Sequence, residues 1–201
     1  MAVAHFILVR AMENDSLLIP VAWLLGTIVA LLVWPFLSIF FHELGHVLAA
    51  KFLGLRPTHL IVGHPDWADP IISRLVFGVK VELWPVPFGG ITLLETLQTN
   101  KLKALIVTLG GPISTCLVVL LALAAFQHWP HSSLFLKFNL GIIILSEAEN
   151  LIYNLIPCSS VYEGVRVPRD GKVLLQILLG RFPGEDLTTL WSERPPAIDQ
   201  G

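Results

Sequence analysis

Two histidines and a glutamate have the spacing of residues that bind and use a metal ion. His42 and His46 are four residues apart, so on a helix their imidazoles lie on one face, one turn apart. Two such imidazoles can reach one zinc ion, and the carboxylate of Glu43 beside them can take a proton from water. Zinc supplies the Lewis acidity that makes water a nucleophile near neutral pH. The motif therefore predicts hydrolytic chemistry with one Zn²⁺ per chain.

A catalytic zinc site also needs a third protein ligand and an open position for water. Four acidic residues downstream of the motif are candidates, and spacing alone does not choose among them: Glu147, Glu149, Glu163 and Asp170. Asn150 and Asn154 are four residues apart and share a helix face with Glu147. Either this face lines the site, with Asn154 hydrogen-bonding the substrate or the oxyanion, or it joins neighbouring helices.

The chain that carries these residues is strongly apolar. Only 14% of its 201 residues are charged, against about 25% in an ordinary soluble domain. Leu17–Phe41 and Ala104–Phe126 contain no charge, and each exceeds the roughly 20 residues that cross a bilayer as a helix. Phe138–Ile156 is also long enough, although it contains two glutamates. We expect a multi-pass integral membrane protein in a lipid bilayer. The net charge of −2 gives no case for nucleic acid.

The first apolar run continues through the histidine motif to about Leu53, where Gly54 predicts its end, and Pro35 predicts a kink within it. From about residue 56 to residue 100 the sequence no longer forms a long apolar run. Val79–Leu83 alternates apolar and polar residues, as a half-buried strand does. We expect a small membrane-associated β insertion here. An unpaired edge of Val79–Leu83 would allow an extended substrate to bind by strand addition, and the alternative is a purely structural hairpin.

Positive charges predict the orientation in the membrane. Two segments are rich in them, one with Lys51, Arg56, Arg74, Lys80, Lys101 and Lys103, the other with Arg166, Arg169 and Lys172. The other side has only Arg10 and Lys137. Three spans place both rich segments on one face, which the positive-inside rule makes cytoplasmic. The N-terminus is then outside and the histidines lie near the cytoplasmic face. The membrane is that of a bacterial cell or of an organelle, and the sequence does not decide which.

Four stretches together resemble the site-2 protease family of intramembrane zinc metallopeptidases. They are the histidine motif at the end of a membrane helix, Pro87–Gly90, Gly110–Pro112, and Asn154–Pro157 followed by Asp170-Gly171. The last three resemble the family's Gly-Gly strand, its Gly-Pro, and its Asn-x-x-Pro and Asp-Gly motif. The resemblance covers about Leu24–Leu179. It implies that Asp170 is the third zinc ligand and that the short helix after Gly171 packs on the core.

The chain departs from the family pattern at two places. In the family the Asp-Gly pair closely follows the proline, whereas here Cys158–Arg169 intervenes. Thr115 occupies the position of an asparagine that follows the Gly-Pro in the family and contacts substrate.

The predicted fold is an all-α integral membrane core with about three transmembrane helices, a short C-terminal helix and a small β insertion. Residues 1–182 form one metallopeptidase domain and 183–201 a loose tail. The predicted function is a zinc endopeptidase that cuts a membrane protein substrate, in which Glu43 is the general base and Asn154 positions substrate. The metal ligands are predicted to be His42, His46 and Asp170.

Two other functions compete with this interpretation. A non-proteolytic relative would bind zinc or a peptide in a regulatory role, and a metal transporter would use His42, Glu43 and Glu147 as a pathway. The chain ends about 30 residues after the Asp-Gly pair. Substrate selection is therefore expected from the membrane core, from an upstream protease or from an adaptor protein.

Overall fold

The structure is a computed structural model that describes residues 2–64, 69–87, 89–95, 100–128, 134–162 and 165–180. The helices and strands, in chain order, are α1 (Ala2–Phe52), β1 (Pro57–Val62), β2 (Ile72–Val76), β3 (Val79–Leu83), β4 (Gly90–Leu94), α2 (Lys101–His128), α3 (Leu134–Leu155), β5 (Ser159–Tyr162), β6 (Val165–Pro168) and α4 (Asp170–Leu178). The predicted helical core with a small β insertion is confirmed. The tail, 183–201, lies outside the described residues.

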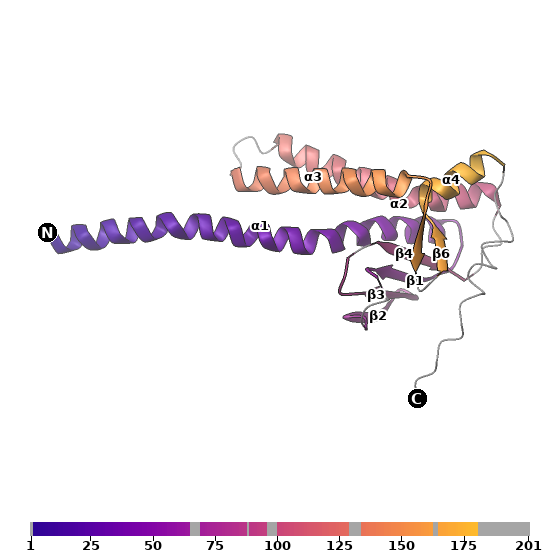
Figure 1. Cartoon of the computed structure of the whole chain (residues 1–201), viewed down its shortest axis with the longest axis horizontal. Helices are drawn as coiled ribbons and strands as arrows, with labels where there is room; N and C mark the ends of the chain where they lie inside the picture. The colour runs from indigo at the N-terminus through magenta and orange to yellow at the C-terminus, as the bar shows by residue number, and fades with distance from the viewer. Residues whose placement is uncertain are drawn as a thin grey trace, which may run out of the picture.

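Three long helices form the core (Figure 1). α1 packs against both α2 and α3, α2 runs in the opposite direction to the other two, and the strands and α4 gather at one end. Trp23–Phe52 and Lys101–His128 are long and apolar enough to cross a membrane. Many large apolar side chains on these helices are exposed, as a lipid-facing surface requires, among them Leu24, Leu32, Leu120 and Leu121. α3 is less apolar, so its membrane crossing stays a prediction.

α1 remains helical through Pro35 and ends at Phe52. The predicted kink at Pro35 is not tested by these boundaries. Gly54 has a φ of 73°, a left-handed conformation that glycine adopts without the steric cost of a Cβ. The predicted end of the helix is therefore confirmed, and the chain turns there from the helix into the sheet.

The β insertion is a four-stranded sheet in the order β2-β3-β1-β4. β3 pairs antiparallel with β2 and parallel with β1, while β1 pairs antiparallel with β4. The expectation of an unpaired edge at Val79–Leu83 is therefore wrong, because this segment is β3 and has neighbours on both sides. The alternation of its side chains reports burial but does not reveal which strands flank it. The outermost strands of this sheet are β2 and β4.

The two faces of the sheet pack against different parts of the chain. Leu60, Val62 and Val79 form a buried cluster with Val47 of α1. Ile61, Ile91 and Leu93 form a second cluster on the alternate positions of β1 and β4, and Val167 of β6 packs against it. α1 therefore covers one face of the sheet and the β5–β6 hairpin contacts the other.

The segment Cys158–Arg169, which departs from the family pattern, forms the antiparallel β5–β6 hairpin. The backbone N–H of Arg169 donates to the carbonyl of Cys158 over 3.0 Å, so the chain returns to the point where it left. α4 then begins at Asp170. A Cβ on Gly171 would collide with the backbone of Leu155, so glycine allows α4 to start directly against the end of α3. The predicted short helix is present and contacts α2 and α3.

Candidate metal centre

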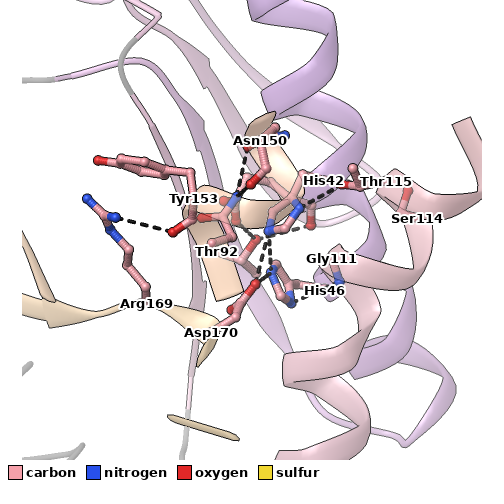
Figure 2. Close-up of polar contacts among 12 residues, drawn as sticks. His42, His46, Thr92, Gly111, Ser114, Thr115, Asn150, Tyr153, Arg169 and Asp170 are labelled. Carbon is pink, nitrogen blue, oxygen red and sulfur yellow. Dashed lines mark hydrogen bonds and ion pairs between the residues drawn. The ribbon is translucent and has the colours of Figure 1, made fainter. Parts of the chain in front are cut away.

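Three predicted ligands, separated widely in the sequence, meet at the end of the helical core (Figure 2). The Nε2 atoms of His42 and His46 lie 3.0 and 3.3 Å from Oδ2 of Asp170, and 3.3 Å from each other. Both histidines are buried and Asp170 is nearly so. Among the residues that the structure describes, this is the one group of three such side chains close enough to share a metal ion.

The outer nitrogen of each imidazole is held by a hydrogen bond. Nδ1 of His46 lies 2.7 Å from the carbonyl oxygen of Val107, and Nδ1 of His42 lies 2.9 Å from Oγ1 of Thr115. A carbonyl accepts, so Nδ1 of His46 carries a hydrogen, and Nε2 is the nitrogen that can bind a metal once it gives up its proton. Such partners fix the tautomer and the orientation of metal-binding histidines. Both rings are thus oriented with Nε2 towards Asp170.

The opposite wall of the cluster is a glycine on α2. A Cβ on Gly111 would overlap Nε2 of both His42 and His46. Only glycine therefore leaves open the space in front of the two ligand atoms, which a metal ion needs. The site therefore explains why residue 111, within the Gly110–Pro112 stretch, is a glycine.

The carboxylate of Asp170 is ionised in this position. Burial by itself raises its pKa, but the positive charge of His46 and hydrogen bonds from both imidazoles lower the pKa to about 2. Two imidazoles and an ionised carboxylate are a ligand set that zinc accepts, and a fourth position is left for water. The residues present therefore fit a zinc ion.

Glu43 lies beside the cluster and is held by the sheet. Oγ1 of Thr92, on β4, donates to Oε2 of Glu43 over 2.8 Å. The Glu43 side chain is buried, yet it lines the cavity that also exposes His42 and His46. No motif in the sequence pointed to Thr92. The one feature that could have pointed to Thr92 is its position two residues after Gly90, in the strand that resembles the family's Gly-Gly strand.

The polar residues on one face of α3 make two kinds of contact. The side-chain amide of Asn150 donates to Oγ of Ser38 on α1 over 3.0 Å, which joins two helices. Asn154 lines the cavity, and its amide donates to Oδ1 of Asn150 over 2.8 Å. Glu147 is fully buried and is not part of the metal cluster.

Of the other acidic candidates, Glu149 is exposed on α3 and Glu163 lies outside the described residues. Thr115, at the position of the family's asparagine, is fully buried and contacts a histidine. Its identity therefore bears on the metal site, which sequence reasoning did not anticipate.

A cavity of about 450 Å³ adjoins the cluster. Its lining includes the three candidate ligands, Glu43 and Asn154. Apolar side chains from β4, α2, the β5–β6 hairpin and α4 complete it, including Ile91, Leu94, Val107, Val161 and Val173. The cavity therefore places a carboxylate base and a metal-binding cluster on a mainly apolar surface.

The fold and the site define a metallopeptidase. The chain belongs to peptidase family M50, the site-2 protease family, whose model matches residues 27–184. Members of this family are membrane-bound zinc metalloproteases. The match begins within α1 and ends beyond α4, so it includes every residue of the cluster. A search of curated proteins gave no match.

Proposed function

We propose that this protein is a zinc-dependent endopeptidase that cuts a membrane protein substrate within or beside the bilayer. The convergence of His42, His46 and Asp170 next to Glu43, in a cavity at the end of membrane-spanning helices, is the observation that carries the proposal. Family membership supplies the reaction class. The two apolar helices that hold the site support the intramembrane setting.

Each residue has a defined part in this proposal. His42, His46 and Asp170 hold Zn²⁺, which supplies Lewis acidity when bound. The carboxylate of Glu43, oriented by Thr92, takes a proton from the attacking water and passes it to the leaving amine. Asn154 lines the cavity, where its side-chain amide, held by donation from Nδ2 to the backbone carbonyl and Oδ1 of Asn150, would position the substrate.

The outer edge of β4 provides a place for the substrate. β4 is an outermost strand, and Gly90–Leu94 contributes several residues to the cavity lining. A segment that adds to this edge is held extended by main-chain hydrogen bonds. An extended peptide bond is open to attack, whereas a bond inside a helix is shielded by its own hydrogen bonds. We therefore propose that the substrate adds as a strand to β4 and not to β3.

We also propose the orientation predicted from the charges. The two basic segments extend over the end of α1, the sheet and the start of α2, and over β6 and the start of α4. These elements lie at the same end of the helices (Figure 1). Placing this end at the cytoplasmic face satisfies the positive-inside rule. An adaptor or an upstream protease would then present the substrate from that side.

The substitution Glu43→Gln tests the reaction. It preserves size but removes the base, so cleavage of a model single-span substrate should fall by about 10²–10⁴-fold, the usual contribution of a general base. Zinc content should stay near one per chain. The matched control is Glu149→Gln on the exposed side of α3, which should cleave normally.

Other outcomes identify the rival functions. Unchanged cleavage by the Glu43→Gln protein would sink the mechanism. A folded wild type that holds zinc but cleaves no substrate would favour a non-proteolytic relative, and zinc flux into vesicles would favour a transporter.

A further inference from the structure

We infer that the β5–β6 hairpin is a specificity element, which forms one wall of a binding subsite for an apolar substrate side chain next to the bond that is cut. This inference rests on the proposed peptidase function and names the kind of substrate side chain that the site accepts. It assigns the hairpin to substrate selection and not to the metal centre.

The hairpin is a closed excursion from the chain. The hydrogen bond from Arg169 N–H to the Cys158 carbonyl joins its two ends, and Ser159–Pro168 lies between them as paired strands. Asp170 follows this closing bond, and the contact of Gly171 with Leu155 positions α4 independently of the strands. The hairpin is therefore not needed to bring Asp170 to the histidines.

Side-chain contacts fix the base of the hairpin. Nε of Arg169 donates to Oγ of Ser160 over 3.0 Å, and its guanidinium carbon lies 3.4 Å from the centre of the Tyr153 ring. Nζ of Lys172 donates to Oγ of Ser159 over 2.8 Å. The hairpin is thus joined to the end of α3 and to the start of α4.

A second set of contacts fixes the hairpin to the sheet. Val167 packs against the buried cluster of Ile61, Ile91 and Leu93. Nε2 of His64, which follows β1, lies 3.2 Å from the carbonyl oxygen of Val161. With both ends and one face held, the hairpin is built as a wall and not as a loose flap.

The cavity side of this wall is mainly apolar. Val161, Val167 and Pro168 line the cavity from the hairpin, together with Ser160, whose hydroxyl accepts from Arg169. Leu94, Val107 and Val173 line it from β4, α2 and α4. The Val161 side chain is 52% exposed, so it is available to contact a ligand. An apolar side chain would be buried here, whereas a charged one would lose hydration.

The charged groups of the lining have other partners. Figure 2 shows the guanidinium of Arg169 turned away from the histidines and towards Tyr153, whose backbone carbonyl accepts from Nη1 over 3.2 Å. Asp170 lies between His42 and His46, and Glu43 accepts from Thr92. The geometry therefore favours an apolar neighbour to the scissile bond.

The first test removes the wall. Residues 159–168 are replaced by Asn-Gly, a two-residue turn suited to joining paired ends. Two model single-span substrates are compared that differ only next to the mapped cut, one with leucine and one with aspartate. The kcat/KM of the wild type should be higher for the leucine substrate than for the aspartate substrate by about 10-fold or more, since apolar pockets typically discriminate by about 10–200-fold. Excision should lower this preference at least about tenfold, with zinc content unchanged.

A point variant guards against misfolding of the excised chain. Val161→Asp should lower the preference for leucine, while Arg166→Asp should leave it unchanged. Arg166 lies directly opposite Val161 in the hairpin but does not line the cavity. Binding of two peptide hydroxamates, one with leucine and one with aspartate, measures the same preference without turnover.

The outcomes separate this inference from the proposed function. Equal preferences in the wild type and the excised protein would overturn the hairpin's role while cleavage continues. Loss of zinc on excision would also overturn it, because the hairpin would then be positioning Asp170. A wild type that binds hydroxamates with the leucine preference but cleaves nothing would overturn the peptidase function and leave the subsite standing.

Discussion

Thr115→Val should weaken zinc binding although Thr115 contacts no metal. The Thr115 hydroxyl is the partner of Nδ1 of His42 at 2.9 Å, and the residue is fully buried. Valine has nearly the same shape but cannot accept a hydrogen bond. The N–H of His42 is then left unpaired, and the ring loses the contact that aims Nε2. Loss of such an outer partner costs about 10–100-fold in metal affinity, which is about 1.4–2.8 kcal/mol.

The assay is competition for zinc between a fluorescent chelator and the detergent-purified protein. Thr108→Val is the matched control, because Thr108 is also a buried threonine of α2, but its hydroxyl donates to the carbonyl of Ala104 in its own helix. Thr115→Ser keeps the hydroxyl and should restore binding. Equal zinc affinities for the two valine variants would refute the reasoning, since loss of any buried hydroxyl would then explain the result.

Two further predictions concern the cluster itself. Asp170→Ala removes a ligand and should weaken zinc binding by more than the ~100-fold upper cost of losing an outer partner; one zinc per chain at limiting metal would instead move the third ligand elsewhere. Gly111→Ala should abolish zinc binding and lower the free energy of unfolding by about 1–3 kcal/mol through overpacking, because its methyl group fills the space between the imidazoles. The control is Gly141→Ala on α3, where an added Cβ meets nothing within 4 Å. That protein should bind zinc normally in the same competition assay.

Local patterns in the sequence determined the chemistry and most of the elements. The spacing of His42 and His46 depends only on helix geometry, so it is readable without a structure. Long apolar runs identified α1 and α2, and the alternation of Val79–Leu83 identified a strand. Gly54 marked the end of the first helix, because a left-handed residue ends a helix wherever it is found.

The position of the proposed substrate-binding edge required the tertiary structure. Strand alternation reports which side chains are buried, but not which strands are neighbours. β1 inserts between β3 and β4 through hydrogen bonds between residues distant in the chain. That pairing covers the edge of β3 and leaves β4 beside the metal centre.

Tertiary structure also decided which acidic residue lies with the two histidines. Spacing left four acids open, and only the resemblance favoured Asp170. The closing bond between Cys158 and Arg169 brings Asp170 back to the end of α3 despite the inserted hairpin. The contacts of Thr92 and Thr115 could not be read from the sequence for the same reason, because each is a hydrogen bond to a residue far away in sequence. The sequence by itself therefore determined the reactive groups, and the non-local contacts decided how they are held and which strand edge lies beside them.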